Sequence, residues 1–158
     1  MNFERLEQRT IPFEEFELKW RFTENKYNVL PTNHLSEIKA LDNEANEMLG
    51  NFLFEGTGLM GQYKLNDEHF DSILEFDLRT KSEKETKNWL KDLNIEPNET
   101  VYLYWNSWGS VFTKWGIFKL YYDDFYYPVS DDLILTNKNA NWILYFFHEE
   151  IIYFGLRK

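Results

Sequence analysis

Cysteine is absent from the 158-residue sequence, so the chain forms no disulfide and uses no thiol chemistry. A chain without cysteine fits a reducing compartment, and we expect a cytoplasmic protein. Long apolar runs are missing as well, since none reaches the ~20 residues that a membrane-spanning helix needs. The first ten residues, MNFERLEQRT, include acidic side chains and no apolar core, unlike a signal peptide. We therefore expect no membrane association.

Basic residues are scarce relative to acidic ones, with 17 Lys and Arg against 27 Asp and Glu and a formal net charge of −10. This balance argues against a nucleic-acid partner, because phosphate binding requires a basic patch. It permits a basic protein partner, which an acidic surface attracts. The acidic excess lies mainly in residues 35–100, with 15 acidic and 7 basic side chains, whereas residues 101–158 hold 6 and 5.

The usual signatures of catalysis and cofactor binding are also missing. The three histidines, at positions 34, 69 and 148, are far apart and have no ligand-type partner one helical turn away, so we expect no metal site and no cofactor. Gly56, Gly58 and Gly61 match the spacing of a dinucleotide-binding loop, but they follow an expected helix instead of a strand. Ser107 lacks the first glycine of the hydrolase nucleophile motif. We predict no catalytic residue.

Aromatic residues, by contrast, are concentrated in residues 101–127, which contain three tryptophans, six tyrosines and three phenylalanines. Aromatic and β-branched residues favour strands. Short runs of this kind alternate with turn residues such as Asn, Ser, Gly and Asp, which predicts an antiparallel meander. The expected strands are Val101–Trp105, Val111–Trp115, Ile117–Tyr122 and Phe125–Tyr127. Most such rings end in a core, but the polar tips of Tyr and Trp also suit a face that meets water, a ligand or a partner.

Outside this stretch, the patterns predict two helices and further strands. Residues 35–52 have an amphipathic period with an acidic polar face, and Ser82 with Glu85 forms a capping box that starts a second helix. Phe13, Phe16 and Trp20 have a helical spacing, whereas residues 16–22 alternate, so we expect a short helical turn that leads into a strand. Alternation also predicts a strand at 71–79, and we expect further strands at 132–136, 142–147 and 151–156. We therefore expect a single α+β domain spanning residues 1–158. Its antiparallel sheet would have about six strands, mostly C-terminal, with two helices packed on one face.

Carboxylate pairs lie near the aromatic residues, in segments expected to be turns. A surface combining both would bind a basic protein, and the predicted binding residues are Trp105, Trp108, Trp115, Asp123, Asp124, Asp131 and Asp132. Exposed aromatic rings beside carboxylates also build sugar sites, so the segment from Trp105 to Trp115 is an alternative ligand cleft. Convergence of the carboxylates would instead suit a small hydrolase.

Three short patterns resemble a small family of uncharacterised bacterial domains of about this length. They are the segments 19–22 (KWRF), 115–119 (WGIFK) and 131–135 (DDLIL), and the likeness covers the N-terminal stretch and most of residues 101–156. This resemblance implies a bacterial protein but no activity. Together with the composition, it leads us to expect a non-catalytic acidic binding protein. An immunity-type protein that neutralises a bacterial toxin is the specific hypothesis, with the hydrolase and the sugar or small-ligand module as alternatives.

Overall fold

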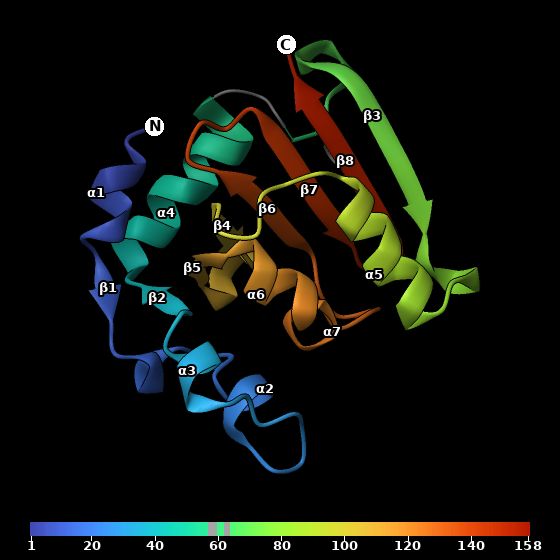
Figure 1. Ribbon diagram of the computed structural model, residues 1–158. Helices are drawn as coiled ribbons and strands as arrows, with labels where there is room; N and C mark the ends of the chain where they lie inside the picture. The colour runs from blue at the N-terminus through green and yellow to red at the C-terminus, as the bar shows by residue number, and fades with distance from the viewer. Residues whose placement is uncertain (57–59, 62–63) are drawn as a thin grey trace.

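The computed structural model describes residues 1–56, 60–61 and 64–158, and within these residues eight strands form one antiparallel sheet (Figure 1). The spatial order is β1-β2-β5-β4-β6-β7-β8-β3. The strands are β1 (Thr10–Ile11), β2 (Lys39–Leu41), β3 (Phe70–Asp77), β4 (Thr100–Tyr104), β5 (Ser110–Lys114), β6 (Leu133–Asn137), β7 (Trp142–Phe147) and β8 (Ile151–Arg157). The longest edge of the sheet is therefore β3, which pairs only with β8.

Helices cover both faces of this sheet (Figure 1). The α-helices are α1 (Phe3–Glu7), α2 (Trp20–Thr23), α3 (Thr32–Leu35), α4 (Asn43–Asn51), α5 (Glu83–Asp92), α6 (Trp115–Leu120) and α7 (Tyr122–Phe125). Side chains of α2, α5, α6 and α7 pack on one face, and those of α1 and α4 pack on the other. Central strands such as β7 are consequently apolar on both faces, because neither face meets water.

The fold class agrees with the sequence, whereas the details of the sheet and its helices differ. The α+β class with an antiparallel sheet is confirmed, and so is the capping box of Ser82 and Glu85 at the start of α5. The expected six strands and two helices on one face are wrong, because the described residues contain eight strands and seven α-helices on two faces. Two-sided burial explains the difference, since it requires helices on each side of the aromatic strands.

The predicted helix at 35–52 is broken by strand β2. Asp42 caps the shorter helix α4 by accepting a hydrogen bond from the Ala45 backbone N–H at 2.8 Å. Lys39 and Ala40 pair with β5, and Leu41 pairs with Thr10 of β1. The buried side chains of Ala40 and Leu41 belong to opposite cores. An N-cap and a long-range strand pairing therefore override the helical apolar period of this segment.

Two predicted strands are helical in the structure. Residues 115–125 form α6 and α7, because Trp115, Phe118, Tyr122 and Phe125 are buried at a spacing of three and four residues. The predicted strand at 125–127 is absent for the same reason. The helical turn expected before residue 16 is present as the 3-10 turn Phe13–Glu15. The strand expected at 16–22 is wrong, because this segment includes α2, in which Arg21 and Phe22 are buried. In these segments the spacing of the buried side chains favours a helix, and this outweighs the strand propensity of aromatic residues.

Candidate functional site

The turn between β4 and β5 carries an exposed tryptophan. Its 3-10 turn η5 (Asn106–Trp108) follows β4, and both Asn106 (φ 58°) and Gly109 (φ 113°) have left-handed backbone conformations. Asn tolerates this conformation better than most residues, and Gly has no steric penalty there. The tight turn leaves the Trp108 side chain 42% exposed, whereas Trp105 is buried in the core. Trp108 is thus the one predicted tryptophan that projects from the surface of the described chain.

A large cleft of about 540 Å³ lies between this turn and helix α4, and we call it the α4 cleft. One wall comes from α4 and the π-helical turn Phe52–Gly56 that extends it, and the other comes from the β4–β5 connection. The lining residues are Asn43, Asn46, Glu47, Gly50, Asn51, Phe54, Glu55, Tyr104, Asn106 and Ser107. Four of them, at positions 43, 47, 51 and 55, recur at the four-residue spacing that lines one side of a helix.

Gly50 shapes the floor of the α4 cleft. A Cβ atom at this position would lie 2.5 Å from the hydroxyl oxygen of Tyr104, so only glycine lets the helix approach this ring so closely. Asn46 joins the two walls, because its Nδ2 donates a hydrogen bond to the carbonyl oxygen of Asn106 at 3.0 Å. The position of the turn that carries Trp108 is therefore connected to helix α4.

A second, smaller cleft of about 160 Å³ lies on the other side of the same turn, and we call it the Asp132 cleft. Its lining residues are Trp105, Asn106, Ser107, Trp108, Ser130, Asp131 and Asp132. The two clefts share Asn106 and Ser107. Among the described residues that line either cleft there are four carboxylates and no lysine, arginine or histidine. The surface around Trp108 is therefore acidic on both sides.

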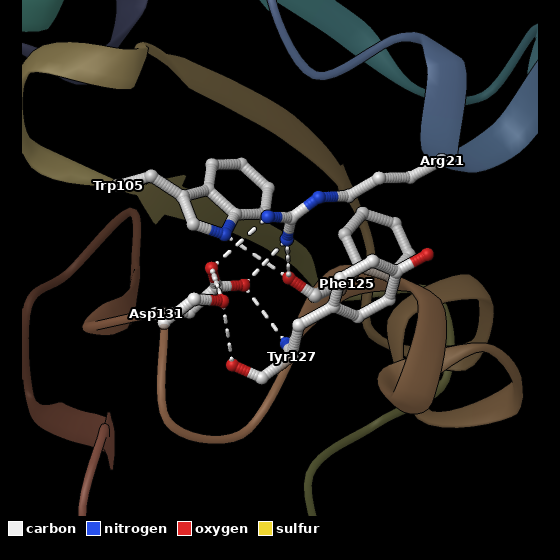
Figure 2. Close-up of polar contacts among 6 residues, drawn as sticks. Arg21, Trp105, Phe125, Tyr127 and Asp131 are labelled. Atoms are coloured by element: carbon white, nitrogen blue, oxygen red, sulfur yellow. Dashed lines mark hydrogen bonds and ion pairs between the residues drawn. The ribbon is translucent and has the colours of Figure 1, made fainter.

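A buried ion pair supports the inner wall of the Asp132 cleft (Figure 2). Arg21 reaches Asp131 with two bonds, Nη1 to Oδ2 at 2.5 Å and Nη2 to Oδ1 at 3.0 Å. Asp131 also accepts hydrogen bonds from the Tyr127 backbone N–H and the Ser130 hydroxyl. The Arg21 guanidinium lies 4.3 Å from the centre of the Tyr127 ring. Because both charges are fully enclosed and paired, Asp131 holds the fold together and offers no free charge to a partner.

Asp132 differs from its neighbour because it lies at the surface. It accepts hydrogen bonds from the Tyr145 hydroxyl at 3.0 Å and from the backbone N–H of His148 at 3.1 Å. Nδ1 of His148 lies 3.0 Å from the same carboxylate oxygen. Burial, reinforced by the Asp132 charge, raises the pKa of Tyr145 well above its usual value. Tyr145 therefore stays a hydrogen-bond donor that fixes Asp132 at the mouth of the cleft.

The remaining predicted residues lie outside both clefts. Trp115 is fully buried at the start of α6. Asp123 is exposed in α7, and the adjacent Asp124 is largely buried and accepts a hydrogen bond from Asn28 Nδ2 at 3.0 Å. Burial raises the pKa of Asp124. The structure thus brings together Trp105, Trp108, Asp131 and Asp132 and separates them from Trp115, Asp123 and Asp124.

The sequence reasoning missed the α4 wall of the larger cleft. The amphipathic period places Glu47 on the polar face of a helix and makes no prediction for the other polar residues of this wall. The alternating amides and carboxylates at positions 43, 47, 51 and 55 and the glycine at position 50 were the available signals. Neither shows which strand the helix faces, so the cleft emerges only from the tertiary packing of α4 on β4.

Within the described residues, no group of three or more histidine or carboxylate side chains lies together in a way that would hold a metal ion. No helix in that part of the chain is both long and apolar enough to cross a bilayer. No family model and no curated protein matches the sequence.

Proposed function

We propose that this chain is a non-catalytic, acidic binding protein that acts in the cytoplasm on a basic protein partner. The observation that carries the proposal is Trp108, an exposed indole between two clefts whose described lining contains carboxylates and no basic side chain. The interface would be the surface of the η5 turn together with the rims of the α4 cleft and the Asp132 cleft. Neutralisation of a bacterial toxin, as by an immunity protein, is the specific form of this function that we propose.

Tryptophan is a favoured anchor at protein interfaces because one rigid side chain buries a large area. Phe54, which is 45% exposed at the far wall of the α4 cleft, adds a second apolar contact. The net charge of −10 attracts a basic surface from a distance, and the carboxylates at the cleft rims orient it on arrival. The aromatic and acidic groups thus have complementary roles in capture of the partner.

The arrangement of the carboxylates favours binding over hydrolysis. Carboxylate pairs that hydrolyse glycosides are separated by roughly 5–9.5 Å. Glu47 lies in α4 and Glu55 in the π-helical turn that extends it, eight residues further along the same wall, so the two carboxylates do not come from adjacent turns. In the other cleft, Asp131 is neutralised by Arg21, and Asp132 is held by Tyr145 and His148. Asp131 therefore has no free charge, and the other three carboxylates, Glu47, Glu55 and Asp132, supply charge at separate places on the two clefts.

A capture experiment with matched variants tests this function. The protein would be immobilised and exposed to extract of its native cells, and retained proteins would be identified by mass spectrometry. We expect a basic protein that Trp108→Ala retains roughly 30-fold more weakly, the scale of an interface anchor. Leu120→Ala is the control, because Leu120 is similarly exposed on α6 and lines neither cleft.

Two results of the capture experiment would reject the proposal: retention of an acidic protein alone, or equal retention by the wild type and Trp108→Ala. The toxin-neutralising form has its own test, in which the captured partner is expressed in cells with and without this protein. We expect the partner alone to stop growth and co-expression of the wild type to restore it. Growth that is unaffected by the partner would contradict neutralisation while leaving the binding function standing.

A further inference from the structure

We infer that the α4 cleft is a binding site for an organic cation, namely the ammonium of a lysine or the guanidinium of an arginine on the partner. This inference rests on the proposed function and identifies which chemical group the cleft takes. The α4 cleft has a volume of about 540 Å³, and two carboxylates but no basic side chain line it.

The carboxylates of helix α4 differ sharply in their surroundings. Glu44 is paired within the protein, at 3.3 Å from Arg5 Nη2 and 2.6 Å from Arg9 Nη2. Glu47 and Glu55 line the cleft, and in the described part of the chain neither has an ion-pair or hydrogen-bond partner. Arginines of the protein thus neutralise Glu44, whereas the charges of Glu47 and Glu55 remain available to a cationic group of a ligand.

The polar side chains of the α4 cleft differ in what they offer a ligand. The Nδ2 group of Asn46 is engaged by the Asn106 carbonyl oxygen, while its Oδ1 is buried and has no donor among the described residues. Buried acceptors without donors are uncommon in folded proteins. The Tyr104 hydroxyl donates to Oδ1 of Asn106 across a long 3.5 Å. Because this Oδ1 atom is enclosed, the acceptors within reach of a ligand are the exposed carboxylates of Glu47 and Glu55, which suit a group that only donates hydrogen bonds, as ammonium and guanidinium groups do.

Two aromatic rings complete the match with a cation. Phe54 and Tyr104 lie with their ring centres 6.1 Å apart, and both line the cleft. A cation held within about 6 Å of an aromatic face gains a favourable interaction with the ring quadrupole, and the alkyl stem of a lysine gains apolar contact. A neutral sugar would also stack on Phe54, but it would leave both glutamates without a counter-charge. The unbalanced carboxylates therefore favour the cation.

NMR titration of the intact protein with small probes tests the inference. The cationic probes are N-acetyl-lysine methylamide and N-acetyl-arginine methylamide, and the neutral ones are N-acetyl-glutamine methylamide and glucose. We expect saturable shifts of the Asn46, Asn51 and Asn106 side-chain amide signals with the cationic probes alone. Spermidine is added as a separate arm, because a free polyamine carries the same chemical group.

Two matched substitutions make the titration decisive. Asn51→Lys places an ammonium between Glu47 and Glu55, where the i,i+4 pairs also support the helix, so we expect probe affinity to fall at least about tenfold. Asn88→Lys makes the same change at an exposed asparagine of α5 and should leave affinity unchanged. Glu47→Gln should weaken binding by roughly fivefold and Glu37→Gln, an exposed control, should not.

Each alternative outcome overturns the inference. Equal shifts with glucose or the glutamine probe would assign the cleft to neutral ligands, and binding of spermidine alone would reject a protein side chain as the ligand. Equal affinities of Asn51→Lys and Asn88→Lys would indicate general attraction to an acidic surface. Any of these results, combined with partner capture that still depends on Trp108, would leave the proposed function intact and reject only the cation site.

Discussion

Arg21 and Asp131 lie 110 positions apart in the sequence and form a two-bond ion pair in the interior, with each side chain at most 1% exposed. The Phe125 carbonyl oxygen links Arg21 to Trp105, because it accepts hydrogen bonds from Arg21 Nη1 at 3.4 Å and Trp105 Nε1 at 3.0 Å (Figure 2). This pair ties α2 to the chain that follows α7, next to the strand end from which the η5 turn begins. The turn that carries Trp108 therefore begins next to a buried ion pair.

Removing one partner of this pair should destabilise the protein strongly. Asp131→Ala leaves the Arg21 guanidinium buried without a counter-charge, and we expect a loss of about 3–5 kcal/mol in the free energy of unfolding. The double variant Arg21→Met with Asp131→Leu should recover most of that loss. Urea denaturation measures both. A cost below about 1 kcal/mol for Asp131→Ala would show that the pair is not enclosed as described.

The tryptophans at 108 and 115 should behave in opposite ways. Trp115 is fully buried between Phe118 and Trp142, so Trp115→Ala should cost about 3–5 kcal/mol of stability. Trp108→Ala should change stability by no more than about 0.5 kcal/mol while it weakens partner capture. Thermal unfolding and capture measured on the same two proteins check the assignment, which a strongly destabilised Trp108→Ala protein would refute.

Gly155 should tolerate no side chain. A Cβ atom there would lie 2.5 Å from Cδ1 of Phe70 and 2.8 Å from Cδ1 of Leu65, so Gly155→Ala should cost about 1–3 kcal/mol through overpacking. Leu156→Ala, at the next and partly exposed position of β8, should cost less. Chemical denaturation of the two variants compares them. An unchanged midpoint for Gly155→Ala would mean that Phe70 moves aside freely.

Asp124 should make stability depend on pH. Burial raises its pKa, so the stability that it contributes is fully present below its unfolded pKa and is lost as the pH rises through the folded value. Asp124→Asn keeps an acceptor for Asn28 and cannot ionise. We expect the variant to gain stability over the wild type from acidic to neutral pH, as followed by thermal unfolding. A constant difference across that range would contradict the assignment.

Local patterns were enough to predict most of the C-terminal sheet. The predicted strands near 101–105, 111–115, 132–136, 142–147 and 151–156 correspond to β4, β5, β6, β7 and β8. Their apolar and aromatic runs are short and separated by turn residues, so local signals agree with the tertiary structure. The strand prediction at 71–79 succeeded in the same way, as β3.

Long-range contacts account for what the sequence could not predict. The strand β2 exists because β1 and β5 pair with it, and the Arg21–Asp131 pair exists because α2 packs beside α7. Trp105, Trp108 and Trp115 are predicted binding residues for the same reason, their position in the aromatic stretch. The tertiary structure is needed to show that Trp108 is exposed and that Trp105 and Trp115 are buried. The α4 cleft likewise depends on which strand the acidic helix faces.

Site-specific photo-crosslinking tests the central claim, that the surface around Trp108 binds a basic protein. The photoreactive residue p-benzoylphenylalanine would replace Ser107, which is exposed and lines both clefts, and in a second protein Glu37, which is exposed and lines neither. On irradiation with native-cell extract, we expect a single covalent adduct with a basic protein from position 107 and none from position 37. Equal adducts from both positions, or none from position 107, would contradict the account.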